Sequence, residues 1–172
     1  MSMNPMKKIK IGKVVVNISV GQSGQPLSNA MQILESVTGQ APNQRAAKQS
    51  IRPWSIRKGE PMACAVTLRG EKADAFLQKA FTAIRHQLNP RSFDKNGNFA
   101  FGIKEHIDIP GTRYDPQMGI IGMDVAVALE RAGYRVSRRK RARSKVGTSH
   151  RITPEEAREF ISKTYDVKMG LE

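Results

Sequence analysis

The sequence repeats one pattern in four short segments, in which large apolar side chains alternate with small or polar ones. The first segment covers residues 13–20, and the others cover residues 62–69, 98–104 and 121–129. Successive side chains of a β-strand point to opposite faces, so a two-residue period predicts a strand with one apolar face. The apolar side chains are Val14, Val16, Ile18, Val20, Met62, Cys64, Val66, Leu68, Phe99, Phe101, Ile103, Ile121, Met123, Val125, Val127 and Leu129. Four such strands predict a sheet.

The other face of each predicted strand carries mainly small or polar side chains. They are Lys13, Val15, Asn17, Ser19, Ala63, Ala65, Thr67, Arg69, Asn98, Ala100, Gly102, Lys104, Gly122, Asp124, Ala126 and Ala128. Small side chains let the backbone of another molecule approach closely, and the polar ones supply hydrogen bonds. An ordinary solvated face is the alternative interpretation.

Three segments have helical signals. Apolar residues recur at helical spacing from Leu27 to Val37 and from Ala73 to Leu88. A shorter helix is expected after Thr153, because Thr153 and Glu156 have the spacing of a capping box. The two longer helices suffice to cover only one face of a sheet. We therefore expect an α+β fold, with residues 1–172 forming a single domain. Its mostly antiparallel sheet has helices on one face and an open second face.

The charge of the chain indicates a polyanionic partner. There are 29 Lys and Arg against 15 Asp and Glu, which gives a net charge of +14. Much of the excess lies in a basic loop, residues 43–59, and in a basic extension, residues 135–151, neither of which contains an acidic residue. This excess favours an open face that binds nucleic acid over one that is merely solvated.

The two basic segments carry different signals. In the basic extension, self-repulsion is expected to keep the chain extended until phosphates neutralise it, although a solvated loop or a localisation signal is an alternative. In the basic loop, Trp54 either stacks on a base or folds back onto the core. The sequence leaves both alternatives for Trp54 open.

Candidate catalytic and metal-binding groups are sparse. Gly21–Gly24 lies between a strand and a helix but lacks the remaining residues of a nucleotide-binding loop. His106, with Glu105 and Asp108 nearby, matches no metal-ligand spacing. Cys64 is the single cysteine and falls on an apolar strand face, so we expect it in the core. We therefore expect no enzyme activity, cofactor or metal.

The sequence predicts a soluble cytoplasmic protein with no membrane partner. Residues 1–13 lack the apolar core of a signal peptide, and no apolar run approaches 18 residues.

Short motifs are spread through the chain from Met6 to Val167. They are Val14–Gly21, Thr38–Gln40, Ala47–Lys48, Ile56–Pro61, Val66–Gly70, Ser92–Asp94, Gly97–Phe99, Phe101–Ile107 and Tyr114–Pro116. Together they resemble the L-five family of large-subunit ribosomal proteins. Residues 119–124, the basic extension and His150–Thr153 resemble its archaeal and eukaryotic branch.

The resemblance implies a structural protein that binds 5S rRNA in the central protuberance through the open face of its sheet. Asn17, Gln40 and Thr67 stand at positions where the family forms hydrogen bonds with RNA. Residues 50–59 resemble a loop that reaches the peptidyl-site tRNA. The implied neighbours are large-subunit rRNA, a second 5S rRNA-binding ribosomal protein and a small-subunit bridge protein.

These considerations give a set of candidate binding residues. Those expected to bind rRNA are Lys13, Asn17, Gln40, Arg45, Lys48, Thr67, Arg69, Arg138, Arg139, Lys140, Arg141 and Arg143. Those expected to contact tRNA are Arg52, Trp54, Arg57 and Lys58. The alternatives are a DNA-binding chromatin protein and a nucleotide-dependent enzyme that uses Gly21–Gly24.

Overall fold

Five strands form one antiparallel sheet in the order β2-β3-β1-β6-β5. They are β1 (Ile9–Ser19), β2 (Asn43–Ala46), β3 (Pro61–Leu68), β5 (Phe99–Ile103) and β6 (Met123–Arg131). A separate parallel pair joins β4 (Gln87–Leu88) to β7 (Lys168–Met169). The computed structural model describes residues 4–170, so both ends of the predicted domain 1–172 lie outside the described residues.

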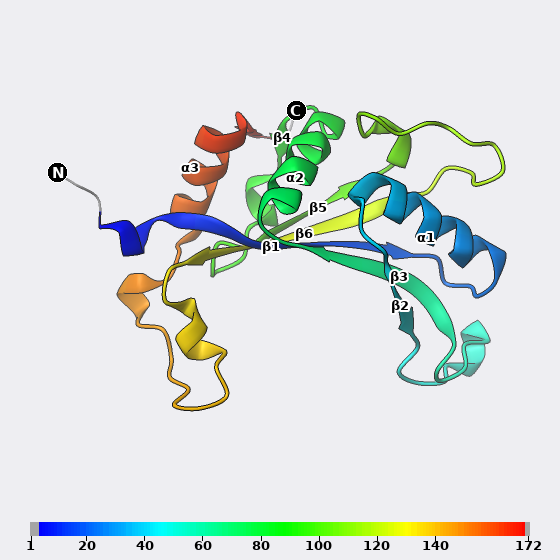
Figure 1. Ribbon diagram of the computed structural model, residues 1–172, viewed down its shortest axis with the longest axis horizontal. Coiled ribbons are helices and arrows are strands. Elements are labelled where there is room, and N and C mark those ends of the chain that lie inside the picture. Colours follow the sequence, from blue (N-terminus) through cyan, green and yellow to red (C-terminus); the bar gives the residue numbers. More distant parts are fainter. Residues whose placement is uncertain (1–3, 171–172) are drawn as a thin grey trace.

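Three α-helices lie on one side of the sheet, as Figure 1 shows. They are α1 (Gln25–Thr38), α2 (Glu71–Ala83) and α3 (Pro154–Tyr165). The capping box expected at the start of α3 is present, because the Thr153 side chain accepts from the Glu156 backbone while the Glu156 side chain accepts from the Thr153 backbone. The predicted α+β fold, with its antiparallel sheet and helices on one face, is confirmed.

The core lies between the sheet and the helices. The predicted apolar faces of the strands are buried there, including Val14, Val16 and Val125, which are fully excluded from solvent. Phe81 of α2 packs its ring against those of Phe99 and Phe101 from β5. Along the strands, the opposite face stays exposed or partly exposed except at Ala65. One face is therefore covered and the other is open.

The strand expected at residues 13–20 begins earlier, at Ile9. A bulge at Gly12 separates two registers, since Ile11 pairs with Leu129 and Lys13 pairs with Ala128. The bulge switches the apolar positions from odd to even residue numbers, so the alternation stops at Gly12 although the strand continues. A β-carbon at Gly12 would meet the end of the Glu130 side chain, which would have to move aside.

Two further predictions were wrong, for the basic loop and for the second helix. Residues 43–46 of the basic loop form the edge strand β2, whose four exposed residues show no apolar alternation. The second helix ends at Ala83, because Arg85 and His86 adopt left-handed φ angles of 54° and 55°. Leu88 instead reaches the core from β4. Over residues 4–170, every helix falls short of the length and apolar character needed to cross a bilayer.

Candidate nucleic-acid interface

Both basic segments lie on the side of the sheet that the helices leave uncovered. In Figure 1, the β2–β3 connection (cyan) and residues 134–150 (orange) extend from opposite ends of the sheet, away from the helices. The open face therefore lies between two basic projections.

The charge of the chain is distributed unevenly between the helices and the basic segments. The three helices hold six acidic and four basic side chains, a net charge of −2. The basic loop and the basic extension together hold thirteen cations and no acidic residue. The electrostatic attraction for a polyanion is thus concentrated away from the helices.

Asn17, Thr67 and Gln40 lie near one another on adjacent elements. Asn17 pairs with Ala65 in the β1–β3 ladder, two residues from Thr67. The Gln40 side chain donates a hydrogen bond to the Thr67 carbonyl oxygen at 3.4 Å. Asn17 Nδ2 donates to Ser19 Oγ at 3.0 Å, so its amide oxygen faces outward without a partner among the described residues. The structure brings together the three residues that the family resemblance selects.

Cations flank these polar groups. Lys13 lies on the open face opposite Ala128, and the Arg69 guanidinium donates to the Gly12 carbonyl oxygen at 3.3 Å. Arg45, in the edge strand β2, is paired with Ala63 and is exposed. Asp124 is an acidic exception on this face, where it can accept hydrogen bonds from base amino groups or ribose hydroxyls.

The basic loop presents its aromatic residue to solvent. Residues Arg52–Trp54 form a short 3-10 helix, and Ser55 closes it in a left-handed conformation with φ 55°. The Trp54 side chain is 72% exposed, so the alternative in which it packs onto the core is wrong. Arg52, Arg57 and Lys58 are exposed as well.

Glu60 fixes the base of the basic loop. Its carboxylate accepts hydrogen bonds from the Arg57 backbone at 3.1 Å and from Ser23 Oγ at 3.0 Å. The Arg57 bond, followed by the Ser23 bond, lowers the pKa of Glu60 below its ordinary value. These contacts tie the loop to Gly21–Gly24, which forms the turn between β1 and α1.

A groove of about 590 Å³ lies where the basic loop meets the end of the sheet. Its lining includes the cations Arg45 and Lys48, the apolar side chains of Ile51 and Ala63, and Trp54. The groove thus combines an aromatic side chain, apolar side chains and two cations.

The basic extension is folded, so the prediction that self-repulsion keeps it extended is wrong. Arg138 forms an ion pair with Glu130 of β6 at 2.5 Å. Arg139 and Arg143 donate through Nε to the carbonyl oxygens of Ala142 and Ser137. Hydrogen bonds between arginines and loop carbonyls thus hold the segment in a closed loop. Lys140 and Arg141 are exposed in it.

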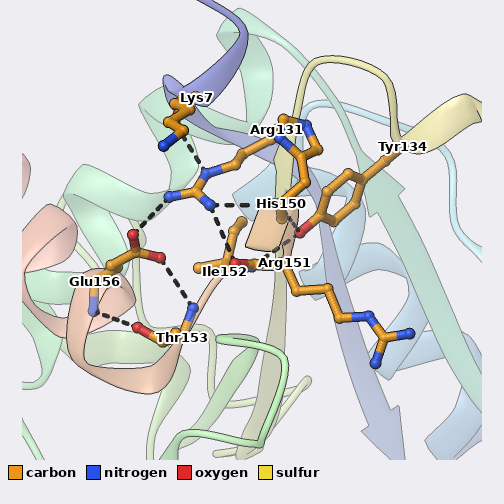
Figure 2. Close-up of polar contacts among 8 residues, drawn as sticks. All are labelled: Lys7, Arg131, Tyr134, His150, Arg151, Ile152, Thr153 and Glu156. Carbon is orange, nitrogen blue, oxygen red and sulfur yellow. Dashed lines mark hydrogen bonds and ion pairs between the residues drawn. The ribbon is translucent and has the colours of Figure 1, made fainter. Parts of the chain in front are cut away.

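The structure contains a group of polar residues at the base of the basic extension that the sequence did not predict (Figure 2). It comprises Arg131, Tyr134, His150 and Glu156. Arg131 is only 6% exposed and donates to Glu156 and to three backbone carbonyls. The burial of Arg131 could have been predicted from the sequence, because Arg131 continues the series of buried, odd-numbered positions in β6.

The residues considered as catalytic or metal-binding candidates are divided between the core and the surface. His106 is buried and its Nδ1 accepts from the Ile121 backbone at 3.3 Å, whereas Glu105 and Asp108 are exposed. Within residues 4–170, no three His, Cys, Asp or Glu side chains are grouped as a metal site would require. Cys64 lies in the core as predicted, and burial raises the pKa of its thiol.

Comparison with known proteins identifies the family. Residues 4–57 match the ribosomal protein L5 family, and residues 61–163 match the C-terminal part of that family. The large ribosomal subunit protein uL5 of Sulfurisphaera tokodaii is 48% identical over 167 residues, covering 96% of this chain and 94% of that protein. The uL5 proteins of Pyrobaculum aerophilum and Nitrosopumilus maritimus are 51% and 45% identical, covering 96% and 97% of this chain and 93% and 96% of theirs. The chain therefore belongs to the ribosomal protein L5 family of the large ribosomal subunit.

Proposed function

We propose that this large-subunit protein binds 5S rRNA with the open face of its sheet and the two basic segments beside it. The observation that carries the proposal is the uncovered face of small and polar side chains, with both basic segments projecting on the same side. In this proposal the protein is a structural, non-catalytic component of the cytoplasmic ribosome.

The chemistry of the open face suits folded RNA. Its small side chains let a sugar–phosphate backbone approach, while Asn17 and Thr67 offer hydrogen bonds to bases or ribose hydroxyls. The basic loop and basic extension contribute phosphate contacts, which supply affinity without reading sequence. Large-subunit rRNA is the second partner that we assign to the extension.

We assign the tip of the basic loop, residues 50–59, to the peptidyl-site tRNA. An exposed tryptophan beside Arg52 and Arg57 combines a stacking surface with phosphate-binding cations. Because Trp54 is largely solvent-exposed, its ring is available to an RNA partner without rearrangement of the core.

We assign the helix side to protein neighbours. It carries little net charge, and the β5–β6 connection on that side exposes Tyr114 (54%) and Ile120 (56%). Exposed large apolar side chains contribute to protein contacts where they lie together in one patch. The neighbours proposed are a second 5S rRNA-binding ribosomal protein and a small-subunit bridge protein.

A competition titration tests the proposal. Labelled 5S rRNA is titrated with the protein at several salt concentrations, with unlabelled 5S rRNA or duplex DNA of equal length as competitor. We expect 5S rRNA to compete strongly and duplex DNA weakly. Each neutralised phosphate should add roughly 0.7–0.9 to the log–log salt slope. Equal competition would favour the chromatin-protein alternative.

A further inference from the structure

Arg131 ends β6 and joins three segments that are distant in sequence. Its Nε donates to the Lys7 carbonyl oxygen at 2.9 Å, and its Nη2 lies 2.8 Å from Glu156 Oε1. Its Nη1 donates to the Arg151 carbonyl oxygen at 3.1 Å and is 3.4 Å from the carbonyl oxygen of His150. A buried guanidinium needs partners for its five N–H groups, and the returning end of the basic extension supplies two of them.

Tyr134 and His150 close the same junction from the other side (Figure 2). The Tyr134 hydroxyl donates to the His150 carbonyl oxygen at 3.3 Å and accepts from the Ile152 backbone at 3.0 Å. The His150 ring nitrogen Nε2 is 2.8 Å from the Ala132 carbonyl oxygen. Since a carbonyl only accepts, this nitrogen carries the proton. The two ends of the basic extension are thus tied to each other within a few residues.

We infer that Arg131, Tyr134, His150 and Glu156 form a stem clamp that holds the basic extension in its RNA-binding shape before RNA arrives. The clamp residues themselves are partly or almost wholly buried, and we assign the phosphate contacts to the exposed cations between them. Arg131 and Tyr134 are therefore positioning residues. This inference rests on the proposed function, in which those cations bind RNA.

The physical basis is the entropy of ordering a long, highly charged loop. Without the stem clamp, residues 132–150 would sample many conformations, and RNA binding would have to restrict them at a cost in affinity. With the clamp, the conformations of residues 132–150 are already restricted when the protein folds, so RNA binding does not bear this entropic cost. The hydrogen bonds of Arg139 and Arg143 to loop carbonyls shape the loop interior in the same way.

Tyr134→Phe is the most discriminating variant, because it removes one hydroxyl and keeps the ring. Arg131→Met would remove the donor to Glu156 Oε1 and to three backbone carbonyls at once and is less suited, since it risks unfolding. Tyr114→Phe is the matched control, because the Tyr114 hydroxyl makes no hydrogen bond among residues 4–170 and Tyr114 belongs to the β5–β6 connection rather than to the basic extension. Both variants are first checked for an unchanged melting temperature.

Limited trypsin digestion of the free protein measures the order of the loop. Trypsin cleaves after Lys and Arg only where the chain opens locally, and the extension is rich in such sites. Loss of two hydrogen bonds at the stem should speed cleavage within residues 138–145 about tenfold in Tyr134→Phe. Tyr114→Phe should cleave at the wild-type rate. Equal rates in all three proteins would overturn the clamp.

A double-mutant cycle then connects the clamp to binding. In the charge-reduced variant, the exposed Lys140, Arg141 and Lys145 are replaced by Gln, which keeps the ion pair and hydrogen bonds of Arg138, Arg139 and Arg143 that shape the loop. Tyr134→Phe should weaken 5S rRNA binding about fivefold to tenfold and lower the salt slope in the wild-type background, and should have a much smaller effect on both in the charge-reduced background. Equal weakening in both backgrounds would overturn the inference.

The outcomes separate this inference from the proposed function. If wild type binds 5S rRNA and the charge-reduced variant binds more weakly, but Tyr134→Phe binds like wild type, the clamp alone is refuted. If the charge-reduced variant binds as tightly as wild type, the proposed role of the basic extension in RNA binding is refuted.

Discussion

Gly97, in the turn before β5, lies directly against Ile152, where the chain returns from the basic extension to α3. A β-carbon on Gly97 would come within 2.7 Å of Ile152 Cγ2 and 3.1 Å of the Ala157 Cβ. Gly97 also has a φ angle of +76°, which side chains other than glycine rarely adopt. This contact packs the returning chain onto the sheet turn.

Gly97→Ala should lower the free energy of unfolding by about 2–4 kcal/mol, the combined cost of a strained backbone and an overpacked core. Denaturant unfolding followed by circular dichroism measures it. Gly147→Ala is the control, because nothing lies within 4 Å of its β-carbon position and its φ is −57°. Equal stability of Gly97→Ala and wild type would show that this contact is not as tight as described.

Asn17→Ala and Thr67→Ala should each weaken 5S rRNA binding by about 1 kcal/mol, because each removes a hydrogen-bonding group from the open face. Neither should unfold the domain. Within residues 4–170 the Asn17 side chain hydrogen-bonds only to Ser19, and the bond from Gln40 goes to the backbone of Thr67 rather than to its side chain. Filter binding measures the affinity. Gln32→Ala, an exposed change on α1, should bind like wild type. Full affinity in both open-face variants would refute the assigned site.

Trp54→Ala should change the free energy of unfolding by less than about 0.5 kcal/mol, because the side chain is 72% exposed. It should weaken peptidyl-site tRNA binding to ribosomes that carry the variant by about 1–3 kcal/mol, the range for one stacked base. Trp54→Phe keeps an aromatic surface and should retain most of the affinity. If the alanine and phenylalanine variants both bind tRNA like wild type, Trp54 does not stack on tRNA.

Glu156 should contribute to acid sensitivity. Burial raises the pKa of Glu156, but hydrogen bonds from the Thr153 backbone and Arg131 outweigh it and hold the pKa below the ordinary value of 4.5. The ionised carboxylate therefore stabilises the fold above pH 4.5, and this stability is lost as the pH falls through the lowered pKa.

Unfolding measured from pH 7 to pH 2.5 checks this. Wild type should be more stable than Glu156→Gln at pH 7, and the difference should vanish at the acid end. Glu159→Gln, an exposed change on the same helix, should show little difference at any pH. A difference between wild type and Glu156→Gln that is constant with pH would contradict the role of the charge.

The faces of the sheet were predictable because burial and side-chain period coincide in β1, β3, β5 and β6. These strands alternate, β1 from Lys13 onward, and a helix-covered face selects apolar residues at every second position. The same logic failed at Gly12, where the bulge changed the phase, and at residues 43–46, where an edge strand exposed on both sides carries no apolar signal. The sequence thus predicts the two-residue alternation of a strand, but not its register or its neighbours in the sheet.

The placement of the two basic segments was not predictable from the sequence. Their charge is local information, but the side of the sheet on which each projects depends on the path of the chain through the fold. The stem clamp was not predictable for a related reason. Arg131 binds mainly backbone carbonyl oxygens, and every residue type supplies those, so its partners leave no pattern in the sequence.

A pair of identical substitutions on opposite sides of the domain tests the central claim most directly. Ala126→Glu adds a negative charge to an exposed position of the open face, and Ala75→Glu adds the same charge to an exposed position of α2. The 5S rRNA affinity of each folded variant is measured at one salt concentration. The account predicts at least about tenfold weaker binding for Ala126→Glu, because a like charge meets the RNA backbone there, and near wild-type binding for Ala75→Glu. Unchanged binding by Ala126→Glu, or an equal loss in both variants, would contradict it.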